Sequence, residues 1–299
     1  MFLITQFIGL AVIHGYQNPD NKLPFGMEPP TEIKEMNGTG FLVQIMIAFI
    51  FAIFLLFILT RLNAEKFLRL WFFVVTTLAI ALTLNLILVF LKINLSPIRL
   101  SILAIVIAFP LAVYKIFKRD IIIHNITELM IYPGIAAVFV PILGSLGIII
   151  LLLAISLYDI WAVWKSEFMQ KMANYQINNL KIFTGFFVPY TNKGQRNKIQ
   201  KIKEKYAKKG EKELEKQLKK AKIKINLAIL GGGDVIFPII TAGIFYKVLG
   251  LVPALIIILS ATIGLLVLFM MARKGKFYPA MPFLTIAMYL GMMVSWLIY

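Results

Sequence analysis

The sequence predicts an all-helical protein that crosses a membrane about nine times. Hydrophobic residues make up 60% of the 299-residue chain and charged residues only 15%, whereas charged residues form roughly a quarter of an average soluble domain. The mean hydropathy is +0.85, and the apolar residues gather in stretches long enough to cross a hydrocarbon core of about 30 Å. The charged residues are too few to cover the surface of a soluble protein of this size. Much of the surface must therefore face lipid.

Nine apolar stretches are candidate membrane-spanning helices, because a chain in lipid must satisfy its backbone hydrogen bonds internally. The first, Phe2–Ile13, is short, so it either continues to Tyr16 or lacks its beginning. It has no basic leading segment and no small-residue cleavage site, which argues against a cleaved signal peptide. The other stretches are Gly40–Leu62, Leu70–Leu91, Pro97–Phe117, Ile121–Leu143, Ser145–Phe168, Ile223–Tyr246, Leu249–Met271 and Pro279–Ile298.

The longest polar interval divides these spans into two blocks. We expect residues 1–169 to form a six-span helical block, residues 170–222 a basic cytoplasmic loop, and residues 223–299 a three-span helical block. In the loop, Ile182–Tyr190 is apolar but too short to cross the membrane. We expect this stretch to lie at the membrane interface or over the mouth of a site.

The basic residues orient the spans. Of the 31 Lys and Arg residues, which oppose 14 Asp and Glu for a net charge of +17, 17 lie between Lys165 and Lys224. If the N-terminus is inside, 26 basic residues lie on the inner side and 5 on the outer side. Because Lys and Arg concentrate on the cytoplasmic side, we expect a cytoplasmic N-terminus and loop in the cell membrane, with the C-terminus outside. A basic loop of this kind meets anionic lipids, so membrane lipids are expected partners and nucleic acid is not.

The composition excludes several classes of catalytic and metal site. The chain has no cysteine, and its two histidines, His14 and His124, form no H-E-x-x-H pair. Disulfides, thiolate metal sites and cysteine nucleophiles are therefore ruled out, and the commonest zinc-protease motif is missing. We expect no metal and no cofactor.

Three acidic residues fall inside predicted spans: Glu128, Asp159 and Asp234. A carboxylate at mid-membrane costs about 2.5–3.5 kcal/mol on insertion scales, so each is by default a candidate functional residue. Counted from Lys165 and Lys224, Asp159 and Asp234 lie about 9 and 15 Å from the inner ends of their helices. We expect these two carboxyl groups to meet in the inner half of the membrane on adjacent antiparallel helices.

Two close carboxyl groups in a dry site cannot both ionise, so they titrate as a unit and share one proton. An aspartic protease uses this arrangement: the ionised group takes a proton from a water, and the protonated group polarises the scissile carbonyl. Proton and cation pathways of transporters also use buried acids. Composition and depth alone are equally compatible with both interpretations.

The residues around the acids favour hydrolysis. Gly231, Gly232 and Gly233 precede Asp234, and each glycine inside a helix costs about 1 kcal/mol relative to alanine. Tight helix packing is the alternative explanation. Pro238 leaves the Asp234 carbonyl without its helical donor. These features indicate a helix that is weakened or closely approached beside the acid.

Two further short motifs accompany the acids. Tyr158 directly precedes Asp159, and the last span opens with Pro279, Ala280, Met281 and Pro282. Proline is favoured at a helix start, and the two prolines also leave backbone groups unpaired near the cytoplasmic face. An extended peptide could pair with such groups.

These motifs resemble, in order and on corresponding spans, the Y-D, G-x-G-D and P-A-L signatures of the presenilin and signal-peptide-peptidase family. They are Tyr158-Asp159, Gly231-Gly232-Gly233-Asp234 and Pro279-Ala280-Met281-Pro282. Met281 replaces the usual leucine, which conserves volume. The resemblance covers the whole chain and implies a presenilin-like fold and an intramembrane aspartyl protease. It also implies Asp159 and Asp234 as the catalytic pair, with the other motif residues shaping the site and substrate docking.

The resemblance implies transmembrane peptides or signal-peptide remnants as substrates. Presenilins carry the loop between their catalytic spans in the cytosol, which agrees with the charge distribution here, so we expect substrates whose spans run with the N-terminus outside. The alternatives are a cation or proton leak channel or transporter that uses the same acids, and an inactive member acting as a membrane chaperone. The isoleucine- and lysine-rich composition is typical of a microbial plasma membrane and favours an archaeal homologue.

One polar group remains outside these motifs. His124, Glu128 and Tyr132 recur every four residues, so they form one helical stripe. The stripe is either a substrate-side or proton-relay cluster, or a polar seam buried between helices. We favour the seam.

Overall fold

The computed structural model shows a helical membrane protein. It describes residues 1–18, 65–118, 120–165, 184–190, 226–271 and 278–298, with a few single positions between 21 and 58. In this part of the chain, seven helices are long and apolar enough to span a membrane, and a shorter apolar helix runs over Phe2–Gln17. Most positions of the expected span Gly40–Leu62 lie outside the described residues, so the total of nine stays a prediction.

The helices follow the predicted spans closely. They are α1 (Phe2–Gln17), α3 (Glu65–Phe90), α4 (Pro97–Phe117), α5 (Ile121–Ile142), α6 (Ser145–Ile160), α10 (Gly232–Leu249), α11 (Leu251–Met271) and α12 (Met281–Ile298). A π-helical turn, Trp161–Lys165, continues α6. Two strands, β1 (Gly185–Tyr190) and β2 (Asn226–Gly231), pair in a two-stranded sheet.

Local sequence signals explain where several helices begin and end. Pro97 occupies the first turn of α4, after the extended N-cap residue Ser96, because proline is preorganised for that position. The Asp120 carboxylate caps α5 by accepting hydrogen bonds from the Ile122 and Ile123 N–H groups at 2.8 and 3.0 Å. Gly250, with φ 95°, ends α10 in a conformation that favours glycine.

The predicted seventh span, Ile223–Tyr246, is wrong at its beginning. Residues 226–231 form strand β2, and α10 begins only at Gly232. A short apolar run that ends at glycines is compatible with both a strand and a buried helix, so periodicity alone could not separate the two. The apolar stretch Ile182–Tyr190 contains the other strand, β1.

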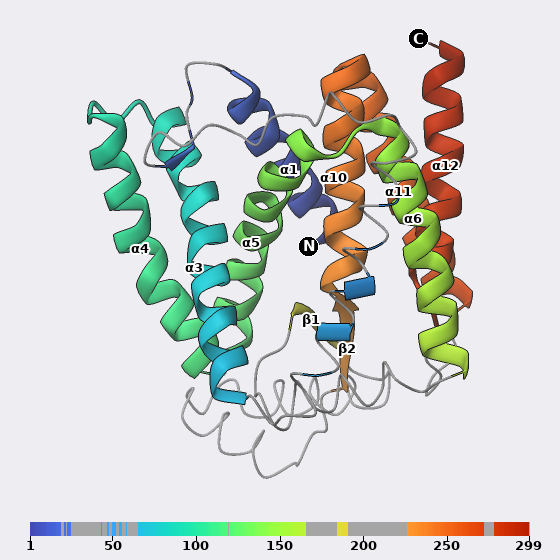
Figure 1. The fold of residues 1–299 in the computed structure, drawn as a ribbon, viewed down its shortest axis with the longest axis horizontal. Coiled ribbons are helices and arrows are strands. Elements are labelled where there is room, and N and C mark those ends of the chain that lie inside the picture. Colours follow the sequence, from blue (N-terminus) through green and yellow to red (C-terminus); the bar gives the residue numbers. More distant parts are fainter. Residues whose placement is uncertain are drawn as a thin grey trace, which may run out of the picture. The chain divides into compact units, whose positions relative to one another are not determined.

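The chain divides into two compact units. The first comprises residues 1–185 and 231–299, and the second residues 186–230. Within the first unit the helices pack in a continuous series, in which α4 contacts α3, α3 contacts α5, and α5 contacts both α1 and α10 (Figure 1). Helix α10 in turn contacts α6, α11 and α12, and α12 contacts α6 and α11. The three helices that carry the sequence motifs therefore pack on one another.

Small residues allow the close helix contacts, as is usual in membranes. A Cβ atom on Gly134 of α5 would overlap the Ala79 carbonyl of α3, so the backbones touch there. Along the α1–α10 contact, Gly9 meets Ile239 and Gly243 meets Ile13. The buried Gln6 side chain donates from Nε2 to the Val235 carbonyl at 3.0 Å. Positions increase together on both helices, so α1 and α10 run parallel.

Replacing Gly134 with alanine is expected to separate α3 from α5, because the new methyl group meets backbone atoms that cannot rotate away. Overpacking of this kind costs about 1–3 kcal/mol, which thermal unfolding of the detergent-solubilised protein would register as a lower Tm. Gly144→Ala is the matched control, since nothing lies within 4 Å of a Cβ there. Equal Tm values for the two variants would contradict this description of the α3–α5 contact.

Candidate active site

Asp159 lies at the C-terminal end of α6, where it accepts hydrogen bonds from the N-terminus of α12. Its side chain is buried, and its Oδ2 accepts from the Met281 N–H at 3.0 Å. The Ala280 N–H contributes a second hydrogen bond. First-turn N–H groups have no acceptor within their own helix, so α6 supplies the acceptor that α12 needs. This contact fixes the orientation of the Asp159 carboxyl group.

A line of polar contacts continues from Asp159 along the α6–α12 contact. One helical turn away, the Ser156 hydroxyl donates to Thr285 Oγ1 at 2.7 Å, and both side chains are buried. Further along, the Tyr289 hydroxyl donates to the Ile149 carbonyl at 2.5 Å. Sequence reasoning missed these residues, although their spacing of three or four positions in apolar helices was a usable signal.

Asp234 occupies the third position of α10, with Gly231 as the N-cap residue. The Gly231 N–H donates a hydrogen bond to its carboxyl group, as the acidic residue of a capping box would receive it. A Cβ atom on Gly231 would lie 3.0 Å from Asp234 Oδ2. The glycines therefore lie at the start of the helix and next to the acid. The cost expected for glycines in a helix interior does not apply.

The structure brings the two aspartates together within the first unit. Helices α6 and α10 contact each other, and Asp234 lies within electrostatic range of Asp159. In the described part of the chain, neither aspartate forms an ion pair. Within the same ranges, no three His, Cys, Asp or Glu side chains gather as a metal site would need. The two carboxyl groups are therefore close enough for the ionisation of one to influence that of the other.

The remaining motif residues lie around this pair. Tyr158 is half-buried, and its ring centroid lies 6.3 Å from that of Trp161 in the π-helical turn. Gly233 is exposed at the start of α10. Pro279 and Met281 are buried beside the first turn of α12, and Ala280 and Pro282 are half-buried.

The stripe on α5 is buried and carries an ion pair. The Lys115 ammonium of α4 binds the Glu128 carboxylate, with side chains only 3% and 1% exposed. His124 and Tyr132 are also buried. Lys115 is one of the 26 basic residues expected on the inner side, and its pairing with Glu128 was not predicted.

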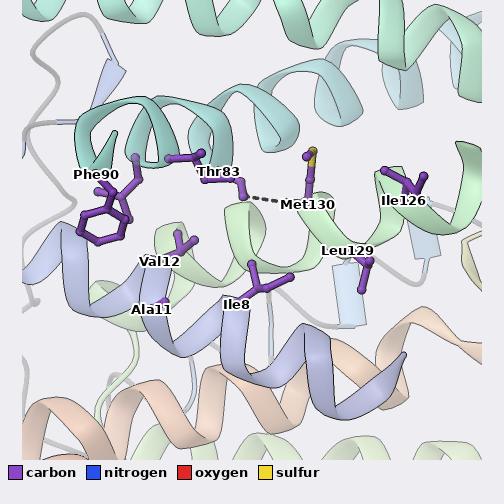
Figure 2. Close-up of a pocket in the computed structure, with 10 residues that line it drawn as sticks. Ile8, Ala11, Val12, Thr83, Phe90, Ile126, Leu129 and Met130 are labelled. Atoms are coloured by element: carbon purple, nitrogen blue, oxygen red, sulfur yellow. Dashed lines mark hydrogen bonds between the residues drawn. The ribbon is translucent and has the colours of Figure 1, made fainter. Parts of the chain in front are cut away.

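A cavity of about 300 Å³ lies away from the aspartates, between α1, α3 and α5 (Figure 2). The Thr83 hydroxyl donates to the Met130 carbonyl at 2.6 Å, so it is already satisfied. The cavity is otherwise lined by apolar side chains and offers no group for acid–base chemistry. The lining residues are Ile8, Ala11, Val12, Thr83, Leu86, Ile87, Phe90, Ile126, Leu129 and Met130.

Comparison with known proteins identifies the family. The model of the family described as "Signal-peptide peptidase, presenilin aspartyl protease" matches residues 1–299, so the chain belongs to this family. No curated protein matches the sequence.

Solved structures agree on the fold. Two crystal forms of a presenilin family intramembrane aspartate protease, in space groups C222 and P2, match the whole chain over 95% and 96% of their own length. Their TM-scores are 0.59 and 0.60, at 15% and 17% sequence identity. This likeness concerns the fold, and the presenilin-like architecture expected from the sequence is confirmed.

The buried Ser156–Thr285 hydrogen bond provides a test of the α6–α12 contact. Thr285→Val should lower the free energy of unfolding by about 1–3 kcal/mol, because the Ser156 hydroxyl is left without this partner. Adding Ser156→Ala should recover part of the loss, since both polar groups are then absent. Denaturation of the two single variants and the double variant measures this coupling. Additive losses would show that the two hydroxyl groups do not interact.

Proposed function

We propose that this chain hydrolyses peptide bonds within transmembrane helices or signal-peptide remnants, with Asp159 and Asp234 as its catalytic pair. The observation that supports the assignment is the approach of two acids from α6 and α10, within electrostatic range and with no ion-pair partner among the described residues. Membership of an aspartyl protease family supplies the reaction class. Neither proposed role requires a metal or a cofactor.

The proposed reaction uses the two carboxyl groups as one acid and one base. The ionised group removes a proton from a water, whose oxygen attacks the scissile carbonyl carbon. The protonated group donates a hydrogen bond to the carbonyl oxygen and stabilises the tetrahedral intermediate. When the C–N bond breaks, the leaving nitrogen takes up a proton, and the pair again holds one proton between its two members.

The substrate must present an extended segment to this pair. The carbonyl groups of a helix are hydrogen-bonded along the helix axis, so local unwinding has to precede attack. We propose that Tyr158, Gly231, Gly232, Gly233 and the Pro279–Pro282 segment shape the space for the unwound peptide. Because the Ala280 and Met281 N–H groups are already bonded to Asp159 and proline has no N–H, substrate pairing at this segment falls to its carbonyl groups.

We further propose that the protein lies in the cell membrane with its N-terminus and residues 170–222 in the cytoplasm and its C-terminus outside. The distribution of Lys and Arg supports this orientation. It places Asp159 and Asp234 nearer the cytoplasmic face. Lipids would contact the basic residues between Lys165 and Lys224.

Asp159→Asn and Asp234→Asn should each lower the cleavage rate of a labelled transmembrane peptide, in reconstituted vesicles, by at least about a hundredfold. An amide supplies neither the base nor the shared proton. Asp120→Asn is the control, since this residue lies outside the pair and asparagine caps a helix equally well. Cleavage that persists in Asp234→Asn would overturn the proposal. Ion flux without substrate that needs the same acids would instead favour the channel.

Substrate orientation gives an independent check on topology. The test uses two peptides with the same span, one inserted with its N-terminus outside and the other inserted in reverse. Only the first peptide should be cleaved. The reason is that a fixed arrangement of Asp159 and Asp234 accepts an unwound strand in one direction. Cleavage of the reversed peptide alone would reject the proposed orientation.

A further inference from the structure

The buried stripe on α5 contacts residues of the first unit that lie directly before and after the second unit in the sequence. That unit comprises residues 186–230, so the chain leaves the first unit after Gly185 and returns at Gly231. Gly185 and Gly232, which we call the stem glycines, both lie against the stripe of His124, Glu128 and Tyr132. The reaction proposed above does not use these three side chains.

The first stem glycine is held by its peptide groups. The Gly185 carbonyl accepts from His124 Nε2 at 2.7 Å, and the Gly185 N–H donates to Glu128 Oε1 at 3.4 Å. A carbonyl can only accept, so Nε2 carries the proton, which leaves Nδ1 to face the Lys115 ammonium at 3.4 Å. Gly185 has φ 140°, a backbone conformation that other residues rarely adopt. The backbone at this position is therefore both anchored and specific to glycine.

The second stem glycine lies against the other end of the stripe. A Cβ atom on Gly232 would lie 2.9 Å from the Tyr132 hydroxyl oxygen. The Tyr132 hydroxyl group lies within electrostatic range of both the Glu128 carboxylate and the Asp234 carboxyl group. Glu128 therefore accepts a hydrogen bond from one stem glycine and lies within electrostatic range of the tyrosine that packs against the other.

The buried ion pair between Lys115 and Glu128 needs a reason beyond stability. Removing two charges from water is expensive, and apolar residues of similar volume often serve stability as well or better. Lys115 and Glu128 bear this cost although they lie outside the aspartate pair. A carboxylate at position 128 can accept from a backbone N–H and interact with a tyrosine hydroxyl at once, which an apolar side chain cannot do.

We propose that His124, Glu128 and Tyr132 form a clamp that fixes both stem glycines to α5, and that Tyr132 is a positioning residue for the α10 turn that carries Asp234. The proposal rests on the proteolytic function argued above. The clamp holds the Asp234 carboxyl group at a fixed distance from Asp159, although the 45 residues of the second unit come directly before this turn in the sequence. It acts on the rate of the chemical step more than on substrate affinity.

Kinetics of a conservative variant test the positioning role. Tyr132→Phe keeps the ring and removes only the hydroxyl group, and should lower kcat by about tenfold or more through misplacement of the acid, with KM within about twofold of the wild type. Tyr16→Phe is the matched control, because it also loses a hydroxyl group that donates a part-buried hydrogen bond, here to the Leu82 carbonyl of α3. This variant should keep kcat within about twofold of the wild type. Equal kcat values for the two variants would overturn the positioning role.

Hydrogen exchange tests the clamp without any need for cleavage. The double variant Lys115→Met/Glu128→Leu removes both charges together, so no unpaired ion destabilises the fold. We expect faster exchange in the peptide of residues 184–190, because the Gly185 N–H loses its acceptor, and Tyr132→Phe should accelerate residues 231–235. Unchanged exchange in both peptides would disprove the clamp. If the wild type cleaves no substrate, the proposed function fails, and exchange still decides whether the clamp exists.

Discussion

The hydrogen bond between the Asp159 carboxyl group and the Met281 N–H joins the acid on α6 to the start of α12. A carboxyl group within an apolar bundle and the open N-terminus of a helix are each costly alone, because both leave polar groups away from water. Brought together, each satisfies the other. The contact fixes how α12 meets α6, and the Ser156–Thr285 hydrogen bond extends the same register by one turn. The P-A-L-like segment is thus a structural partner of the acid as well as a candidate substrate surface.

Asp234 solves the same problem within its own helix. It accepts from the Gly231 N–H at the start of α10. Both carboxyl groups therefore accept hydrogen bonds from a helix N-terminus, Asp159 from that of α12 and Asp234 from that of its own helix. Helix N-termini present unsatisfied N–H groups and favour negative charge. Two such ends meeting in one place let a membrane protein keep two acids close together without a basic residue between them.

Much of this could be predicted from the sequence. Apolar length gave the ends of α4, α5 and α11 to within two residues, because lipid forces each span to be a helix. The buried acids and their neighbouring motifs pointed to the family. The beginning of α10 could not be predicted, since the apolar run before Gly231 suits a strand as well as a helix. The partners of Glu128 and Asp159 were also missed. Lys115 and the Met281 N–H come from other helices, and only the packed structure brings them within reach.

The parallel contact of α1 with α10 has a consequence for how the protein is made. Gln6 donates to a carbonyl 229 positions further along the chain, and His14 pairs with a tyrosine 232 positions away. A ribosome delivers α1 to the membrane long before those partners exist. Until α10 arrives, the amide of Gln6 must be accommodated by lipid, water or the insertion machinery, so α1 completes its contacts only late in synthesis.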